Sequence, residues 1–594
     1  MEDGWKVESS PVHQAIWRHG GIEAFDSADP DVPGSVRAVM DRSLATVLRH
    51  KQARTRYGPD GIIAPELVAD LAQAGYWGMR ASPAYGGAGA NIRALAQFVT
   101  DMAVVDPWVA GMMSIQACIG PVFLLETFGT SEQKERLLPP LATGQRLGAF
   151  AVTERGAGSD WRGIRTVARR EGDWLFVSGE KLYISNAGPG RTVGVLCLID
   201  GSHQVLLIEL PQQENERFQT LSYPLKALAH IKNVGLVFNS LPVPAANVLR
   251  PSHGDGRSIA YCALNHGRLA MCANAAAQLR IIAGSLIPWV QQRQTFGAPI
   301  GSRELVQRRL GWLAGRIVAC DAMTAWVAGL LEEGYRGELE CVTAKVFSTE
   351  AVKEACVDVL LKTHGARAFL EGNVFGDLIF DMLMPTIGEG ENEVLTLGCF
   401  RSLAQEHGEH FLAPIAAALS DGSHQDAPGH HPGAADLLAA GSHAASYAAW
   451  FVGEEIRHAL RHFQHRLSAD PAELSGVAQE LLAAMALEIS AALRHFGAAA
   501  AHRQALAFDL ARRAQLATVM LVVSRYAARQ QDPLVRQAGV CAALDLGARL
   551  TDSRPNALMY HLVTELGRAV AEDRFPPVHD AERGAVLMAE PTAG

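Results

Sequence analysis

The sequence predicts a mainly α-helical protein with a central β domain, and three observations support this prediction. Near the start of the chain, Leu67, Leu71 and Ala74 lie on one face of a helical pattern. Between about residues 148 and 250, short runs of branched and aromatic residues alternate with turns, which is typical of strands. From residue 258 to about 407, long helical patterns return, with lengths that suit a helical bundle.

The individual elements follow from periodicity and from turn residues. Gly75 ends the first helical pattern, and the turn-rich residues 83–89 follow it. The predicted strands cover 174–177, 192–198 and 205–208. The predicted helices of the bundle cover 264–287, 305–331 and 341–361.

The length of 594 residues exceeds one ordinary domain, so two to four domains are expected. Residues 420–433 are rich in Gly, Pro and His and lack periodicity, which indicates a linker. The chain beyond it is rich in Ala and Leu and is predicted to be helical. The predicted domains are an N-terminal extension (1–60), an N-terminal helical domain (61–148), a β domain (149–252), a helical bundle (253–410), a linker (411–436) and a C-terminal helical domain (437–594).

Composition restricts the class of function. A hydrophobic content of 48% and a charged content of 19% describe a globular protein with a large core. The net charge of −9 argues against a general nucleic-acid binder. Nine cysteines without a Cys-x-x-Cys pair fit reduced thiols better than a disulfide framework or a zinc site, so no metal is expected.

The sequence indicates a cytoplasmic protein. The first ten residues are polar with charges of both signs, unlike a secretory or transit peptide. No window reaches the roughly eighteen consecutive apolar residues that a membrane span needs. Residues 475–494 and 505–526 are candidates for amphipathic helices at a membrane surface, although their Ala-rich faces favour packing between helices.

Three segments occur in a characteristic order. Residues 151–163 read AVTERGAGSDWRG, residues 293–297 read RQTFG and residues 387–393 read IGEGENE. They resemble the first signature, the flavin-pyrophosphate motif and the catalytic-glutamate segment of the acyl-CoA dehydrogenase family. The resemblance covers about residues 60 to 407. Residues 264–268, LNHGR, and the extra C-terminal domain resemble the very-long-chain branch most closely.

The resemblance implies an oxidoreductase that uses FAD to dehydrogenate a saturated acyl thioester between Cα and Cβ. A base takes the Cα proton, and the Cβ hydride passes to flavin N5. Glu389 is the predicted base, and its flanking glycines allow the backbone to approach a ligand closely. Without the other two motifs, this acidic run would be interpreted as a solvated loop. The family's alternative position for the base is Gly267 here, which cannot abstract a proton.

Substrate contacts are also implied by position. The amide of Glu389, with Gly390 next to it, is expected to hold the thioester carbonyl. Asn265 and Arg268 match positions that contact the substrate or shape the surroundings of the base, although Arg268 is also interpretable as a surface charge. Ser159 is expected to bond a flavin phosphate or the thioester end of the substrate, and His266 to be a packing or surface residue rather than a catalytic one.

The resemblance implies contacts to the flavin ring from the signature and from a following strand. Thr153 and Ser185 are expected to bond the ring, and Tyr183 to cover it, although such a strand is also typical of a β core. The matching positions are Phe150, Val152, Thr153, Tyr183, Ile184 and Ser185.

The remaining cofactor contacts lie in the bundle. Arg293 is expected to reach the FAD pyrophosphate of a partner subunit, flanked by Thr295 and Phe296, so a homodimer is the minimum assembly. Residues 362–369, KTHGARAF, depart from the family's Gln-x-x-Gly-Gly-x-Gly-Tyr. Lys362, Gly365 and Glu391 are expected around the adenosine half, with Lys362 pairing either a phosphate or Glu391.

Several functions remain open at this level. The leading one is fatty-acid β-oxidation of acyl-CoA, with an electron-transfer flavoprotein as the acceptor. The rivals are an acyl-CoA oxidase that uses O₂ and a dehydrogenase for acyl groups on an acyl-carrier protein. A DNA-associated stress-response relative is disfavoured, because no lysine follows Lys362 and the C-terminal part holds more acids than arginines.

Overall fold

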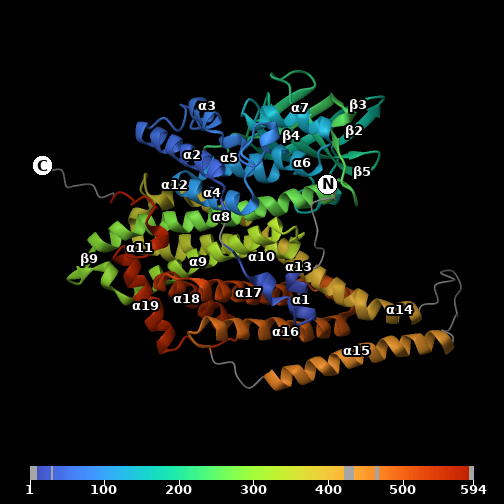
Figure 1. Cartoon of the computed structure of the whole chain (residues 1–594), viewed down its shortest axis with the longest axis vertical. Helices are drawn as coiled ribbons and strands as arrows, with labels where there is room; N and C mark the ends of the chain where they lie inside the picture. The colour runs from blue at the N-terminus through green and yellow to red at the C-terminus, as the bar shows by residue number, and fades with distance from the viewer. Residues whose placement is uncertain (1–9, 29–30, 420–433, 462–466, 587–594) are drawn as a thin grey trace.

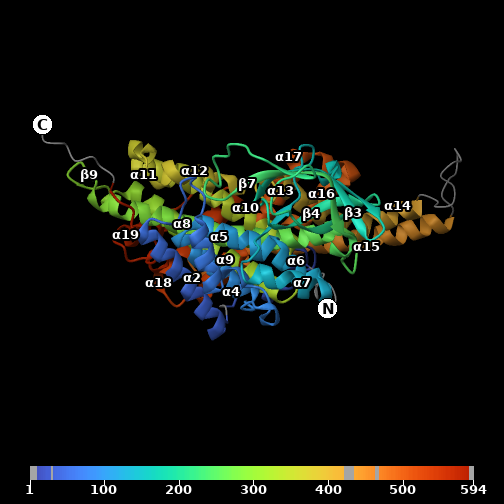
Figure 2. The ribbon, with the colours of Figure 1, turned by 90° about the horizontal axis from the view of Figure 1, so that it is seen from above.

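The computed structural model describes residues 10–28, 31–419, 434–461 and 467–586. Figure 1 shows three tiers: the N-terminal helices and the β-sheet lie at the top, long bundle helices cross the middle, and the C-terminal helices lie below. Seen from above in Figure 2, the molecule is elongated, with the β9 hairpin and helices α14 and α15 at opposite ends. The predicted class, mainly helical with a central β domain, is confirmed.

The N-terminal helical domain forms around its own apolar cluster, which includes Trp77, Phe98 and Met113. The helix predicted from periodicity is α3, and Gly75 ends it in the left-handed conformation with φ +88°. The helices of this domain are α2 (Gly34–Ala53), α3 (Pro65–Ala74), α4 (Ile92–Val105), α5 (Pro107–Met113), α6 (Pro121–Phe128) and α7 (Ser131–Ala142).

The β domain is one eight-stranded sheet with the order β6-β7-β3-β2-β4-β5-β8, and β1 pairs with β4 in parallel. Its apolar face is built from alternating positions such as Val193, Val195 and Leu206. The strands are β1 (Gly148–Ala151), β2 (Val167–Glu171), β3 (Trp174–Ser185), β4 (Thr192–Ile199), β5 (Ser202–Glu209), β6 (Phe218–Leu221), β7 (Asn233–Pro244) and β8 (Val248–Leu249).

The bundle and the C-terminal region share one apolar core rather than two. The bundle consists of α8 (Gly256–Gln292), α9 (Glu304–Glu332), α10 (Glu338–Glu354), α12 (Val374–Leu383) and α13 (Asn392–His407). The C-terminal helices are α14 (Ala413–Leu419), α15 (Ala434–Arg461), α16 (Pro471–Phe496), α17 (Gln504–Arg529), α18 (Pro533–Leu550) and α19 (Ala557–Ala571). Helices α18 and α19 pack directly on α9.

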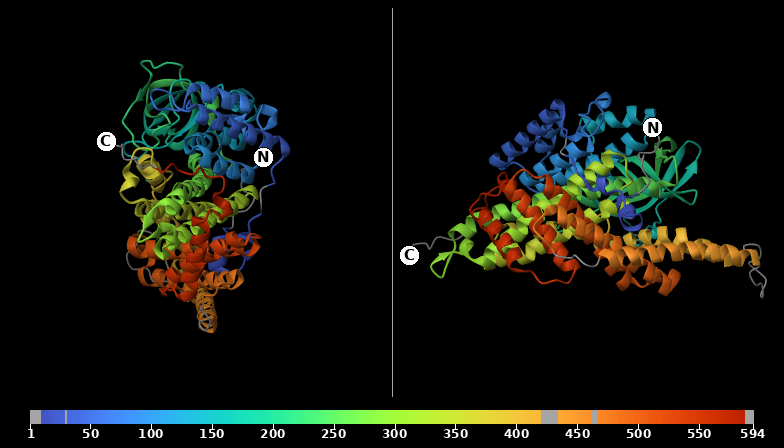
Figure 3. Two further views of the ribbon diagram at one scale, coloured as in Figure 1. Left: turned by 90° about the vertical axis from the view of Figure 1, so that its left-hand side faces the viewer. Right: turned by 60° about the horizontal axis from the view of Figure 1, so that its bottom comes forward.

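Two predicted boundaries differ from the structure. In the predicted N-terminal extension, α1 (Pro11–Trp17) packs on α16, Trp17 stacks on His407 of α13, and α2 belongs to the N-terminal domain. The predicted linker 411–436 contains α14 and the start of α15, and its residues 420–433 lie outside the described part of the chain. Figure 3 shows α14 and α15 projecting together from the body.

The expectation that no segment is apolar enough for a membrane span needs correction. In the described residues, four helical stretches reach the length and hydropathy of a span: Pro107–Phe128, Gly256–Gln292, Glu304–Glu332 and Pro471–Phe496. Between 56% and 89% of each apolar window is buried inside the protein. Packing in the core therefore accounts for most of their apolar character.

We predict that Gly567→Ala destabilises the protein. A Cβ at Gly567 would lie 2.8 Å from the Cα of Gln307 and closer still to its carbonyl, so α19 would have to move away from α9. Such overpacking costs about 1–3 kcal/mol. Thermal unfolding with circular dichroism measures the change. Gly398→Ala on α13 is the matched control, because a Cβ there meets nothing within 4 Å and we expect a small gain in stability.

Candidate functional site

Glu389 lies on a strained turn between α12 and α13. Its φ is +53°, and Gly390 follows at +105°, so two consecutive residues adopt the left-handed side of backbone space. The side chain of Glu391 then caps α13, accepting hydrogen bonds from the amides of Glu393 (3.0 Å) and Val394 (2.9 Å). The cap fixes the end of the turn, and the turn directs the Glu389 side chain towards α8.

The carboxylate of Glu389 rests on α8 at Gly267. A Cβ at Gly267 would lie 2.5 Å from Cδ of Glu389 and closer to both carboxylate oxygens. Any other residue at position 267 would therefore displace the carboxylate. The Oε2 atom is shielded from solvent and has no hydrogen-bond partner among the described residues. The backbone N–H of Glu389 also lacks a partner in the described part of the chain.

Two α8 side chains hold the backbone of this turn. Arg268 is buried rather than on the surface, and its Nε and Nη2 each donate to the carbonyl of Glu389 at 3.4 Å. Its Nη1 donates to Oδ1 of Asn265 at 2.8 Å. Asn265 in turn donates to the carbonyl of Arg336 at 3.1 Å. Both residues were predicted near the base, and the structure places them there.

Sequence reasoning missed a second buried cation beside the turn. Lys345 on α10 is fully buried, and its Nζ donates to the Gly390 carbonyl (2.7 Å) and to Oδ1 of Asn392 (2.8 Å). Asn392 also donates to Oγ1 of Thr349 (3.1 Å) and to Glu350 (2.8 Å). No motif marks Lys345. Only its position in the middle of a helix with buried neighbours indicates a role.

Burial dominates the ionisation of the turn. It raises the pKa of Glu389 to about 7, although the charges of Arg268 and Lys345 act in the opposite direction. Burial also lowers the pKa of Lys345 to about 8, while Glu389 opposes this change. A carboxyl that titrates near neutrality is suited to general-base catalysis, because it is ionised often enough and still basic.

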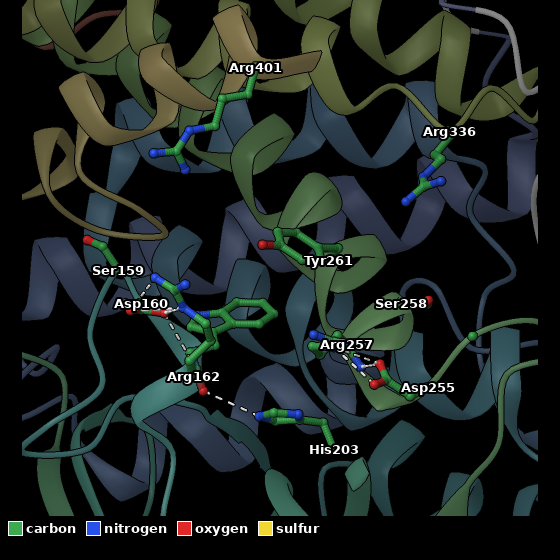
Figure 4. Close-up of a pocket in the computed structure, with 12 residues that line it drawn as sticks. Ser159, Asp160, Arg162, His203, Asp255, Arg257, Ser258, Tyr261, Arg336 and Arg401 are labelled. Atoms are coloured by element: carbon green, nitrogen blue, oxygen red, sulfur yellow. Dashed lines mark hydrogen bonds and ion pairs between the residues drawn. The ribbon is translucent and has the colours of Figure 1, made fainter. Parts of the chain in front are cut away.

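A cleft of about 580 Å³ opens beside the N-terminal end of α8. Figure 4 shows arginines from four segments facing it, with Tyr261 of α8 in the centre. Arg162 and Arg257 pair with Asp160 and Asp255, whereas Arg401 makes no hydrogen bond or ion pair to the residues described. The predicted residue Ser159 lines this cleft.

A second, narrow cavity lies between α4 and α8, on the other side of Gly267 along α8. The α8 residues His266, Leu269 and Ala270 form one wall. Its free volume is about 10 Å³, which is room for about one water molecule. His266 is buried there, as predicted for a packing residue.

The predicted flavin-ring residues lie at neighbouring strands of the sheet. Phe150 is on β1, and the carbonyl of Thr153 accepts from the amide of Leu182 on β3 at 2.9 Å. Behind them, the buried pair Glu154–Lys181 (2.8 Å) ties the signature segment to β3, and Lys181 also donates to the Val152 carbonyl at 2.9 Å. Sequence reasoning did not identify this pair. It explains why the signature contains a glutamate.

The strand residues 183–185 divide between two faces. Tyr183 lies at a break in the β3–β7 register with φ +59° and is 58% exposed, and Ser185 accepts from Nδ2 of Asn233 at 2.8 Å. Ile184 points the other way, into the core of the β domain. Because successive side chains of a strand point to opposite faces, a contact of Ile184 with the cofactor would come from its backbone, and this contact stays a prediction.

The RQTFG segment forms a tight hairpin beyond the end of α8. Strands β9 (Gln294–Thr295) and β10 (Ala298–Pro299) are joined by Phe296 and Gly297, with φ values of +47° and +78°, as a two-residue hairpin turn requires. Phe296 is 98% exposed. Arg293 is exposed at the C-terminus of α8, 6.0 Å from the ring of Trp289.

The adenosine-end prediction needs one correction. Lys362 pairs with Asp358 on its own helical turn, and the Glu391 carboxylate is occupied as the cap of α13. The alternative in which Lys362 pairs with Glu391 is therefore wrong, whereas the contact of Glu391 with the cofactor stays a prediction. Gly365 adopts φ +66°, which accounts for a glycine at that position.

Two family models match the chain, "Acyl-CoA dehydrogenase, N-terminal domain" over residues 32–145 and "Acyl-CoA dehydrogenase, C-terminal domain" over residues 254–403. The chain belongs to the acyl-CoA dehydrogenase family. The predictions of this family, of an oxidoreductase and of FAD dependence are thereby confirmed at the level of the family.

Individual relatives are distant. An acyl-CoA dehydrogenase of Bacillus subtilis is 28% identical over 56% of this chain and 88% of its own length. The very long-chain specific acyl-CoA dehydrogenase of Macaca fascicularis is also 28% identical, over 61% of this chain and 56% of its own length.

Solved structures show the extent of the shared fold. An acyl-CoA dehydrogenase complexed with FAD from Bacillus anthracis has a TM-score of 0.72 at 18% identity, and the match covers 96% of this chain and 99% of that one. The likeness therefore includes the C-terminal helical region. The prolyl acyl carrier protein oxidase AnaB has a TM-score of 0.57 at 22% identity, covering 64% of this chain and 100% of its own.

We predict that Glu389→Gln stabilises the protein increasingly as the pH rises from about 4.5 to 7. The folded-state pKa of about 7 exceeds the ordinary value of 4.5, so ionising this buried carboxyl costs stability that the neutral amide does not lose. The difference in unfolding free energy should grow by about 1–3 kcal/mol across this range. Denaturant unfolding at pH 5 and pH 7.5 measures it. Glu393→Gln, which alters an exposed carboxyl nearby, is the control, and a pH-independent difference for Glu389→Gln would contradict the account.

Proposed function

We propose that this protein is an FAD-dependent dehydrogenase of saturated acyl thioesters in which Glu389 removes the proton from Cα. The observation that carries this proposal is the placement of one buried, unbonded carboxylate oxygen directly on the bare backbone of Gly267. A carboxylate oxygen that is shielded from solvent and lacks a hydrogen bond lowers the stability of the fold. A catalytic role is one reason why a native protein retains such a group. Proton abstraction next to a thioester carbonyl is a task that suits a carboxyl of raised pKa.

The substrate path runs along α8. The open cleft adjoins residues 255–261, the base rests on Gly267, and the narrow cavity adjoins His266, Leu269 and Ala270. At about 1.5 Å of rise per residue, Ser258 and Gly267 lie about 13 Å apart along the helix. An extended carrier arm in the cleft would thus deliver its thioester to Glu389 and its acyl group to the cavity.

The groups around Glu389 account for its chemistry. Its own N–H is available to bond the thioester carbonyl, where negative charge develops when Cα loses its proton. Arg268 and Lys345 bond the carbonyls of Glu389 and Gly390, so the turn keeps its shape while the carboxyl gains the proton. Their positive charges also favour the ionised carboxylate that acts as the base.

The residues at the edge of the β domain fit a flavin. Tyr183 presents an exposed aromatic face, and Thr153 and Ser185 supply hydroxyl groups on neighbouring segments. When bound, FAD would supply the acceptor for the Cβ hydride, which carries both electrons of the oxidation. We propose an electron-transfer flavoprotein as the next acceptor, with O₂ as the alternative.

We also propose a homodimer. Arg293 and Phe296 lie on the β9 hairpin, which Figure 1 places at the end of the molecule opposite the β domain. One chain therefore cannot bring its own hairpin to its own Tyr183. A second copy could, and the fully exposed Phe296 indicates a surface that such a partner covers.

The arginines of the cleft fit a phosphate-bearing carrier. Arg401 lacks a partner among the described residues and supplies the unbalanced positive charge of the cleft, whereas Arg162 and Arg257 on the opposite side are paired with Asp160 and Asp255. Coenzyme A and the phosphopantetheine arm of a carrier protein both present such phosphates. We favour coenzyme A because the curated relatives reported above act on acyl-CoA by name, whereas the AnaB likeness at 22% identity extends to the fold alone.

We predict that saturated acyl-CoA bleaches the flavin of the purified protein under anaerobic conditions. Glu389→Gln should slow this bleaching by at least about 1,000-fold, because no other carboxylate rests on Gly267. In the wild type the rate should rise with pH to a plateau above about 7, as Glu389 ionises. Stopped-flow absorbance measures both effects. Bleaching only by carrier-protein thioesters would replace coenzyme A as the carrier, and undiminished bleaching by the variant would exclude Glu389 as the base.

A further inference from the structure

The narrow cavity between α4 and α8 contains an arginine. Arg80 lines it together with apolar residues such as Leu95, Val99 and Leu269. Arg80 follows Met79 in the segment after α3, so it belongs to neither of the two helices that form the cavity. A guanidinium is an unusual lining for a cavity that only needs to hold a hydrocarbon chain.

Arg80 has no anionic partner in the part of the chain that the structure describes. Its guanidinium lies over the ring of Phe123 at 5.0 Å and makes no hydrogen bond or ion pair to the described residues. The two carboxylates whose charge it feels are engaged elsewhere, because Glu126 accepts from the amide of Ser82 (2.6 Å) and Glu332 from that of Ile92 (2.6 Å). Burial lowers the pKa of Arg80, yet an arginine stays protonated in proteins.

The other polar groups of the cavity do not neutralise this charge. His266 bonds the carbonyl of Cys262 through Nδ1 (3.1 Å), and burial together with the charge of Arg80 lowers its pKa to about 3. The imidazole is therefore neutral at physiological pH. Burial raises the pKa of the Cys118 thiol to about 12, so Cys118 is neutral as well. The cavity thus holds one positive charge and no negative one among the residues described.

We infer that this cavity receives an acyl group with a carboxylate at its far end, and that Arg80 binds this carboxylate. The inference rests on the proposed function, since it assigns the substrate class of that same site. A carboxylate supplies the missing counter-charge and matches the planar guanidinium with two parallel hydrogen bonds. The substrate class is then the monothioester of a short dicarboxylic acid.

The size of the cavity and the charge of Arg80 disfavour acyl groups that are long, cationic or neutral. The free volume of about 10 Å³ holds about one water molecule, so every acyl group must displace lining side chains, and a short acyl group displaces fewer of them than a long one. A cationic aminoacyl group would meet the like charge of Arg80. A neutral short acyl group would leave the guanidinium buried without a partner, which costs affinity.

The test compares thioesters of matched length. Anaerobic flavin reduction is followed with butyryl-, valeryl- and hexanoyl-CoA and with succinyl-, glutaryl- and adipyl-CoA. We expect the best carboxylated thioester to exceed its neutral counterpart in kcat/KM by about 10- to 100-fold. Arg80→Met should remove this preference, so that carboxylated and neutral thioesters of matched length are reduced with similar kcat/KM. Arg80→Lys should retain part of it, because it keeps the charge but not the planar fork.

Arg93→Met is the matched control, since Arg93 on α4 pairs with Glu333 (2.9 Å) and lines neither cavity. It should retain the preference of the wild type. Two outcomes would overturn this inference while leaving the proposed function intact. One is bleaching by neutral thioesters with no preference for carboxylated ones, and the other is a preference that survives Arg80→Met. No bleaching by any thioester would overturn the proposed function and the inference with it.

Discussion

The close approach of the Glu389 carboxylate to the backbone of Gly267 is the contact on which the site depends. It requires a residue without a side chain on α8 and a left-handed turn between α12 and α13. Both features lower the stability of the folded protein. A glycine weakens a helix by about 1 kcal/mol, and a non-glycine residue with positive φ is strained. The surrounding helices overcome both costs by burying the turn between α8 and α10.

Two buried cations bond the backbone of this turn. Arg268 and Lys345 bond the carbonyls of Glu389 and Gly390 rather than the carboxylate itself. The carboxylate therefore feels their charge without being neutralised by a direct ion pair. Desolvation remains the larger effect and keeps the pKa near 7, where a base is both available and effective.

The sequence predicted the parts of the structure that depend on local pattern or on motifs. Helix α3, the strands from 174 to 208 and the position of Glu389 follow from periodicity and from short signatures. Lys345 and Arg80 could not be predicted, because their roles arise from helices that meet only in the folded chain. The same reason explains why α1 and the C-terminal helices, predicted as separate regions, share one core with the bundle.

The most direct test moves the base from one side of the contact to the other. Glu389→Gly removes the carboxylate, and Gly267→Glu in the same chain restores one at the position where the two segments touch. The rate of anaerobic flavin reduction by acyl-CoA is then compared in the single and double variants. We expect Glu389→Gly to be inactive and the double variant to recover measurable reduction. A folded, flavin-loaded double variant as inactive as Glu389→Gly would contradict it.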